Sequence, residues 1–73
     1  MSPQIEILSV VALLEDLREQ RLVRGQVGTV VEILAPGVYE VEFCDESGRT
    51  YAMVALKAEQ LIQLVHESAP QVA

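Results

Sequence analysis

Hydrophobic and polar residues alternate along three consecutive stretches in the middle of the chain, a pattern typical of half-buried β-strands. The alternation is most regular over residues 38–44. We expect Tyr39, Val41 and Phe43 on the inner face of this strand and Glu40 and Glu42 on its outer face. Branched and aromatic side chains favour such strands because they pack well on a pleated surface.

The neighbouring stretches, 26–34 and 50–56, are also rich in strand-forming residues. Along the first stretch, one face carries Val27, Thr29, Val31 and Ile33, and the other carries Gly28, Val30, Glu32 and Leu34. In the second, Thr50, Ala52, Val54 and Leu56 share one face, and Tyr51, Met53 and Ala55 share the other, which we expect to point outward. These patterns predict a strand on each side of the central one.

Turn-forming residues separate the three strands, which therefore form a meander. Pro36 and Gly37 predict a tight turn because proline presets φ and glycine supplies a positive φ. Gly48 ends a polar stretch that predicts the second turn. Gly25 precedes the first strand, and Gly28 inside it predicts a bulge or a sharp bend.

The segments on either side of the meander are ambiguous. Residues 8–17 match the spacing of a helix, which local propensity favours, and they also alternate as a strand with Val10, Ala12 and Leu14 on one face. Residues 18–24 are polar and predict a loop, and residues 57–60 predict one helical turn. Residues 61–65 fit either a final short strand or a continuation of that turn.

A meander with one strand before it and one after it is the plan of a small barrel. We therefore predict an all-β, five-stranded SH3-like barrel with a short 3-10 or helical turn before the last strand. The barrel would span residues 10–66, with residues 1–9 as a leader or an extra edge segment and residues 67–73 as a flexible tail. With 73 residues the chain has room for one core, and pairing with a second copy is another way to remove open strand edges.

Four segments within residues 10–65 also resemble a known protein family in their order and spacing. They are VALLEDL at 11–17, RGQVGTVVE at 24–32, YEVEF at 39–43 and LKAEQL at 56–61. The family consists of short, stand-alone proteins of cyanobacteria and other bacteria and is described only as a domain of unknown function. The resemblance implies an SH3-like barrel, and hence a strand rather than a helix near the start of the chain. It implies no catalytic residues.

Composition narrows the classes of function. The formal charge is −6, from eleven acidic and five basic residues, and an acidic surface repels nucleic acids and anionic membranes. No apolar stretch near the N-terminus is long enough to span a bilayer. The single cysteine, Cys44, cannot form an internal disulfide, which fits a reducing compartment. We therefore expect a cytoplasmic protein with no membrane contact.

No combination of residues predicts a catalytic, metal or cofactor site. A zinc site requires three or four ligands, and the chain offers a single histidine, His66, and the distant Cys44. Gly25 and Gly28 precede a β-branched run rather than the helix that a phosphate-binding loop requires. We expect neither enzymatic activity nor a cofactor.

Three groups of residues are candidates for binding a partner, and they are predicted to lie on the surface. They are the loop arginines Arg18, Arg21 and Arg24, the outward carboxylates Glu40 and Glu42 with Asp45 and Glu46 nearby, and the apolar pair Tyr51 and Met53. Aromatic residues and methionine are enriched at interfaces. An N-terminal segment that contains Ile5 and Ile7 is an alternative cover for the apolar pair.

These features favour a non-enzymatic module that binds another protein. An antitoxin or immunity protein that acts on the product of a neighbouring gene is its most concrete form. A small accessory subunit of a metalloenzyme or redox complex is a second interpretation. A nucleic-acid-binding domain that uses the three arginines is a third, which the acidic charge and the few aromatic residues disfavour.

Overall fold

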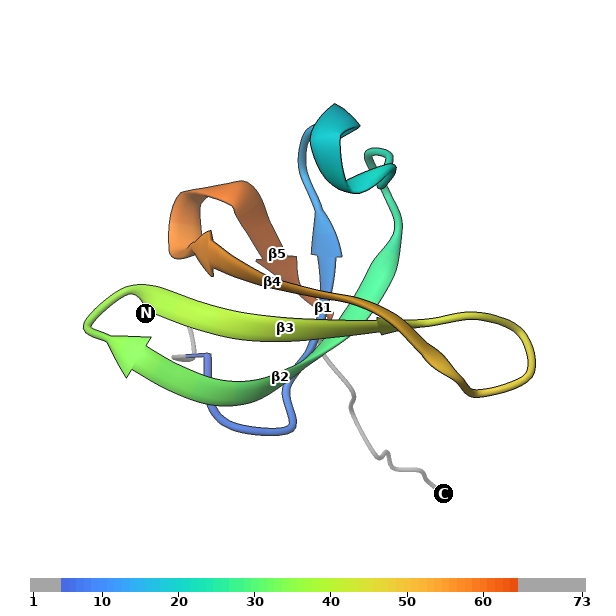
Figure 1. Cartoon of the computed structure of the whole chain (residues 1–73). Coiled ribbons are helices and arrows are strands. Elements are labelled where there is room, and N and C mark those ends of the chain that lie inside the picture. Colours follow the sequence, from blue (N-terminus) through green and yellow to red (C-terminus); the bar gives the residue numbers. More distant parts are fainter. Residues whose placement is uncertain (1–4, 65–73) are drawn as a thin grey trace, which may run out of the picture.

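A computed structural model describes residues 5–64 of the chain. The elements follow one another as β1 (Val10–Leu13), η1 (Arg18–Gln20), β2 (Val27–Ala35), β3 (Val38–Cys44), β4 (Thr50–Lys57), η2 (Ala58–Gln60) and β5 (Leu61–Gln63). The five strands form one antiparallel sheet in the order β4-β3-β2-β1-β5, and η1 and η2 are single 3-10 turns (Figure 1). The described part of the protein is therefore all-β, with a 3-10 turn before its last strand, as the sequence predicts.

Strand β2 is shared by the two halves of the sheet. Its first residues pair with β1, and its residues from Thr29 onward pair with β3. Thr29 itself lies opposite Val10 on one side and Glu42 on the other. Strand β2 curves along its length, so the β1–β5 half crosses behind the β3–β4 half (Figure 1). The sheet thus curls around a single core.

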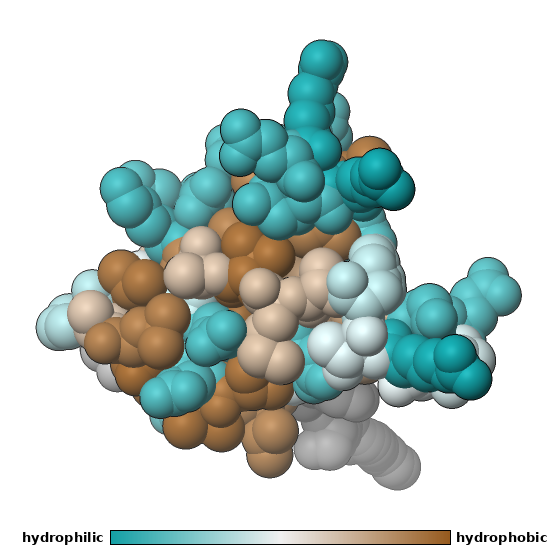
Figure 2. Space-filling model, in the orientation of Figure 1, coloured by the Kyte–Doolittle hydropathy of each residue, from teal (hydrophilic) through white to brown (hydrophobic). Residues whose placement is uncertain are grey.

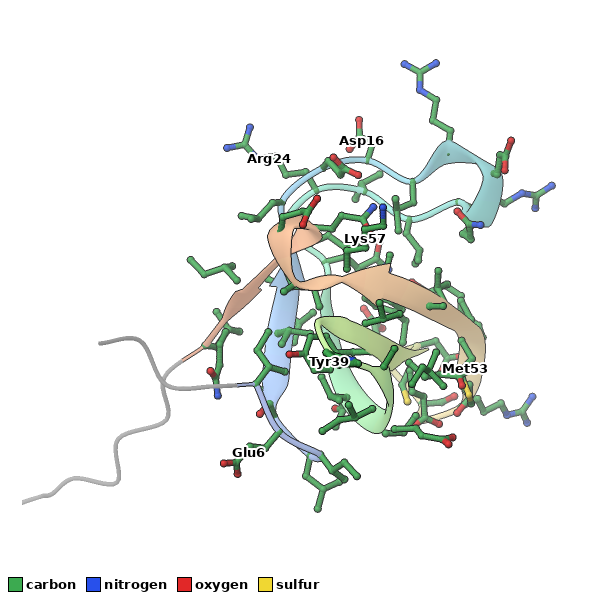
Figure 3. The ribbon with its side chains drawn as sticks, turned by 90° about the vertical axis from the view of Figure 1, so that its left-hand side faces the viewer. Glu6, Asp16, Arg24, Tyr39, Met53 and Lys57 are labelled. Atoms are coloured by element: carbon green, nitrogen blue, oxygen red, sulfur yellow. The ribbon has the colours of Figure 1, made fainter. Side chains whose placement is uncertain are left out.

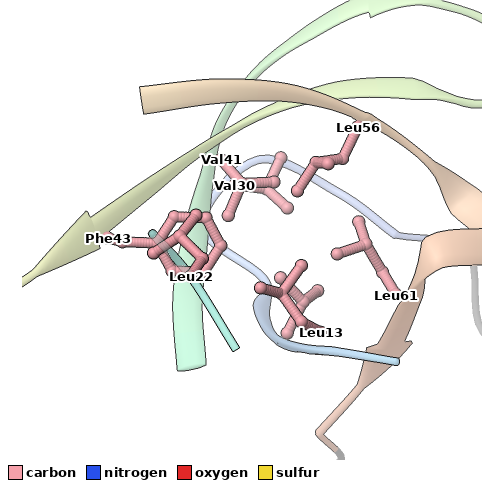
Figure 4. Packing of buried hydrophobic residues seen from close by; sticks show 8 residues of the cluster. Leu13, Leu22, Val30, Val41, Phe43, Leu56 and Leu61 are labelled. Atoms are coloured by element: carbon pink, nitrogen blue, oxygen red, sulfur yellow. The ribbon is translucent and has the colours of Figure 1, made fainter. Parts of the chain in front are cut away.

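The core lies between the two halves of the sheet (Figure 4). Its buried members are Val11, Leu13, Leu22, Val30, Val41, Phe43, Leu56 and Leu61. Tyr39 packs against this cluster, so the inward set of β3 is confirmed as Tyr39, Val41 and Phe43. Leu22 comes from the loop between β1 and β2 and is only 1% exposed, which anchors that loop to the core.

The first strand shows where local propensity is misleading. The helix that the spacing of residues 8–17 favours is wrong, and the strand that the family resemblance implies is confirmed as β1. Ala12 lies opposite Val27 of β2 and Ile62 of β5, so β1 is held by strands on both sides. Backbone pairing with two neighbours outweighs the helix propensity of leucine and alanine. Residues 61–63 likewise form a strand, β5, rather than a longer helical turn.

The alternation predicted for β2 holds only as far as Val30. The pairing register with β3 shifts between Val30 and Glu32 and again between Ile33 and Ala35. Because each bulge adds one unpaired residue, Glu32 and Ile33 change faces relative to a regular strand. Ile33 consequently lies opposite the inward Tyr39, and Glu32 lies opposite the outward Glu40. The strict two-face assignment for residues 27–34 is therefore wrong beyond the first bulge.

Gly28 is buried and pairs in register with Val11, so the bulges of β2 lie after it rather than at it. A β-carbon added at Gly28 would lie 2.7 Å from Val41 Cγ1, 2.8 Å from Phe43 Cε1 and 2.9 Å from the Glu42 carbonyl oxygen. All three separations are shorter than van der Waals contact allows. Glycine is required here because β3 packs directly onto the backbone of β2.

The remaining glycines serve the connections. Gly25, Gly37 and Gly48 all have positive φ, and a β-carbon at any of them would meet open space. Gly37 follows Pro36 in the two-residue turn between β2 and β3, as the sequence predicts. These positions need the backbone freedom of glycine, whereas Gly28 needs its lack of volume.

Replacing Gly28 by alanine should destabilise the protein by about 1–3 kcal/mol, because the added methyl group overpacks the contact with β3. The free energy of unfolding can be measured by urea denaturation. The loss should be smaller when Gly28→Ala is made in a Val41→Ala background, because the Cγ1 atom that lies 2.7 Å away is then missing. Strictly additive losses would contradict the packing explanation.

Candidate functional site

The outer face of β2, β3 and β4 carries two rows of side chains that cross all three strands. Directly paired residues share a face, so the register defines the rows. They are Thr29–Glu42–Met53 and Glu32–Glu40–Ala55. In both rows a glutamate on β3 lies beside an uncharged residue on β4. We call the outer side chains of Glu32, Glu40, Glu42, Tyr51, Met53 and Ala55 the acidic–apolar face.

The apolar part of this face is open to solvent. Tyr51 is 45% exposed and Met53 is 50% exposed. The described part of the N-terminal segment runs along β2 on the side away from β3, where the Leu8 N–H donates to the Val30 carbonyl and the Val30 N–H donates to the Ser9 carbonyl. The described part of this segment, which contains Ile5 and Ile7, therefore does not form the alternative cover over Tyr51 and Met53.

The acidic part of the face is a strip of neighbouring carboxylates. Glu32 lies directly opposite Glu40, and like charges at such positions destabilise a sheet by up to about 1 kcal/mol. Glu42, the next outward residue of β3, accepts a hydrogen bond from the Thr50 hydroxyl. The strip therefore opposes stability and attracts cations.

The predicted arginine group lies on the long loop between β1 and β2. Leu17 and Leu22 exchange two backbone hydrogen bonds of 2.9 and 3.1 Å, which close the loop around η1. The Arg24 N–H donates to Asp16 Oδ1 at 2.8 Å, and Gln60 Nε2 donates to Glu15 Oε2 at 2.8 Å, which ties the loop to η2. The loop is thus a well-held structure.

The charge of this loop is mixed rather than basic. Arg18, Arg21 and Arg24 are all exposed, and so are three acidic residues of the same loop, Glu15, Asp16 and Glu19. Figure 2 shows hydrophilic residues over this end of the molecule, whereas apolar ones gather at the β2–β3 hairpin, where Ile33 and Leu34 are exposed. Figure 3 shows Arg24 and Met53 well apart. Arg24 and the acidic–apolar face therefore do not form one site.

Asp45 and Glu46, which the sequence groups with the acidic strip, lie in the turn between β3 and β4. Asp45 Oδ1 accepts hydrogen bonds from the Ser47 hydroxyl at 2.8 Å, the Ser47 N–H at 2.9 Å and the Arg49 N–H at 3.0 Å. These bonds lower the pKa of Asp45, with the Ser47 hydroxyl as the largest cause and the Arg49 N–H next. Asp45 is thus engaged in holding its turn.

A second apolar surface, absent from the sequence-based candidates, lies on the outer face of β1, β2 and β5. Val27, Ala12 and Ile62 form one row across these strands, and Val27 and Ile62 are each 50% exposed. Its row contains no charged residue. This surface depends on the pairing of β1 with both of its neighbours. The sequence does not predict it, because the local spacing of residues 8–17 favours a helix.

Within residues 5–64, no cluster of three or more His, Cys, Asp and Glu side chains is arranged to hold a metal ion. Cys44 is exposed and free, and His66 lies outside the described residues. None of the helices in the described part is long and apolar enough to cross a membrane.

Comparison with known families gives a match over most of the chain. The family model described as "Domain of unknown function (DUF4926)" matches residues 7–63, so the chain belongs to this family. The match spans every strand from β1 to β5. No curated protein and no solved structure shows significant similarity to the chain.

Replacing Asp45 by asparagine should lower stability at neutral pH and should remove part of the acid sensitivity. Because the folded state lowers the pKa of Asp45 below 3.8, its carboxylate stabilises the fold above that pH, and this contribution is lost as the pH falls through the folded-state pKa. Urea midpoints of the two proteins should therefore differ at pH 7 and converge below pH 3.8. The variant Glu46→Gln, which removes one charge from the same loop, is the control. A gap that stays constant in acid would contradict this role.

Proposed function

We propose that this DUF4926 protein is a non-enzymatic protein-binding module with an SH3-like barrel fold, and that it docks a basic partner on its acidic–apolar face. The strand order, the long loop after β1 and the 3-10 turn before β5 support the barrel assignment. The binding role is supported by a single arrangement: Glu42 lies opposite the half-exposed Met53, and Glu40 lies opposite Ala55. Apolar contact and charge attraction can therefore act together on one surface.

The unfavourable pairing of Glu32 with Glu40 strengthens this interpretation. A sheet face that only needed to be solvated would be more stable with opposite charges or neutral residues at these positions. Local arrangements that oppose stability are concentrated at functional sites. A basic partner would turn this repulsion into attraction, since its positive charges would lie between the two carboxylates.

An antitoxin or immunity protein that neutralises a basic neighbouring gene product is the most specific form of this proposal. Such a partner should co-purify when the two genes are expressed together. An accessory subunit would use the same face, and the identity of the captured partner separates the two. The mixed charge of the β1–β2 loop offers no support for nucleic-acid binding.

Affinity capture from the source organism tests the proposal. The double variant Glu40→Lys/Glu42→Lys should lose the partner that the natural protein captures, because the charge of the face is reversed. The matched control Glu6→Lys/Glu59→Lys also changes the net charge from −6 to −2, since each reversal adds two, and it leaves the face intact. The control should retain the partner, and the capture should weaken as ionic strength rises.

Equal capture by both double variants would contradict the proposed face, and absence of any partner under low-salt conditions would contradict the binding role. Thermal melts of the three proteins verify that each is folded. A partner that is acidic rather than basic would also contradict the proposal.

A further inference from the structure

Strand β4 is an edge of the sheet, and it is unusually open. Every paired residue of β4 lies against β3, and no backbone hydrogen bond reaches residues 50–56 from any other part of the described chain. Residues 50–56 contain no charge and no proline, and the only lysine of the strand is its last residue, Lys57. Charges, prolines and bulges normally protect such an edge. Here a register shift affects only its first residues.

The hydrogen bonds of β2 identify the backbone groups that are free. Both backbone groups of Val30 are bonded to the N-terminal segment, so its pair with Val41 carries no hydrogen bonds. The N–H and C=O groups of Val41 therefore point away from β2 and bond to Val54 of β4. Along each strand, these groups point to opposite sides at successive residues. The Ala58 N–H donates to the Gly37 carbonyl at 2.9 Å. This bond fits the alternation, because Ala58 and Val54 are separated by an even number of positions and should point to the same side.

It follows that Met53 and Ala55 direct their N–H and C=O groups away from β3, toward the open edge. Lys57 has the same orientation, and its N–H is already bonded to Gln60 Oε1 at 2.8 Å. The open edge thus presents two consecutive bonding positions, at Met53 and Ala55, the residues that end the two rows of the acidic–apolar face.

We infer that an extended segment of the partner, alternating basic and apolar residues, pairs with the open edge of β4 as a sixth strand. This inference rests on the proposed function and specifies how the partner binds. Strand addition supplies affinity through backbone hydrogen bonds, and side chains on alternate positions supply specificity.

The two rows determine which side chains the added strand needs. Residues opposite Met53 and Ala55 extend the rows that contain Glu42 and Glu40. Neighbouring strands are about 4.8 Å apart, so the added strand lies about 10 Å from β3. Lysine or arginine stems can cover that distance over Met53 and Ala55 while their charged ends approach the glutamates. The intervening residues point toward the inner side, beside Val54, and are therefore apolar.

A second copy of this chain fits the edge poorly. Its own β4 would bring only Lys57 as a positive charge. Two chains of charge −6 would also place their acidic strips on the same face of one continuous sheet. The complementary occupant is a basic segment of a different protein.

Titration of the ¹⁵N-labelled protein with a blocked eight-residue peptide of alternating lysine and valine tests the inference. Binding should slow the hydrogen exchange of the Met53 and Ala55 amides by at least about tenfold at saturation, because these N–H groups become hydrogen-bonded. A peptide of alternating glutamate and valine should not bind. Two further versions of the lysine–valine peptide carry N-methyl groups, one on every lysine and the other on every valine. The version whose methyl groups face the edge should bind at least about tenfold more weakly than the other.

Met53→Lys and Ile62→Lys form a matched pair, since both natural side chains are 50% exposed and lie on the two edge strands of the sheet. Met53→Lys should weaken peptide binding at least about tenfold by placing a like charge on the edge. Ile62→Lys should leave it unchanged. Equal effects of the two variants, slowed exchange confined to β5 or the β1–β2 loop, or no binding at millimolar peptide would each overturn the inference.

Strand addition at β4 can be wrong while the proposed function is correct. Capture that depends on Glu40 and Glu42, with Met53 and Ala55 amides unchanged in the captured complex, overturns strand addition alone. Dimerisation of the pure protein through β4 would also overturn it, because the occupant would then be a second copy. If the natural protein captures no partner at all, the proposed function itself fails.

Discussion

The close approach of β3 to the backbone of β2 at Gly28 is the constraint on which the rest of this structure depends. A single methyl group there would lie less than 3 Å from Val41, Phe43 and the Glu42 carbonyl. Val41 and Phe43 are fully buried, and Phe43 is the largest fully buried side chain in a core with few members. Because a domain of this size has little stability in excess, the core cannot tolerate a displaced β3.

The close packing of β3 on β2 also determines which surfaces of the sheet remain exposed. Strand β2 pairs with β1 at its start and with β3 from Thr29 onward, so the sheet turns across one strand and surrounds its core. It ends at β4 on one side and β5 on the other, and neither edge is paired in the described part of the chain. The carboxylates and the exposed apolar residues of β3 and β4 accumulate beside one of these edges. The proposed binding surface is thus a consequence of how the sheet is folded.

The sequence predicts most of this architecture but only part of the surface. Strict alternation identifies β3 and both of its faces, and turn residues such as Pro36 and Gly37 locate the connections. Pairing determines what alternation cannot. Val10–Leu13 becomes β1 because two strands hold it, and Ile33 changes face because of a bulge that leaves no local signature. The reason for Gly28 lies in residues of another strand, more than ten positions away.

The candidate surface divides in the same way. Glu40, Glu42, Tyr51 and Met53 are recognisable as outward residues from their own strands. That Glu42 lies opposite Met53, and Glu32 opposite Glu40, depends on the register between strands, which no single segment encodes. The three arginines illustrate the converse. They stand out as a basic group, but Glu15, Asp16 and Glu19 lie beside them in the chain and are equally exposed in the folded loop, which gives that surface a mixed charge.

Hydrogen exchange of the free protein tests the central claim, that the folded sheet leaves β4 with an open and ordered edge. The amides of Ala52, Val54 and Leu56 should be protected because they bond to β3, and those of Met53 and Ala55 should exchange much faster because they face solvent. Uniform protection from Ala52 to Leu56 would show that the edge is covered and would contradict the account.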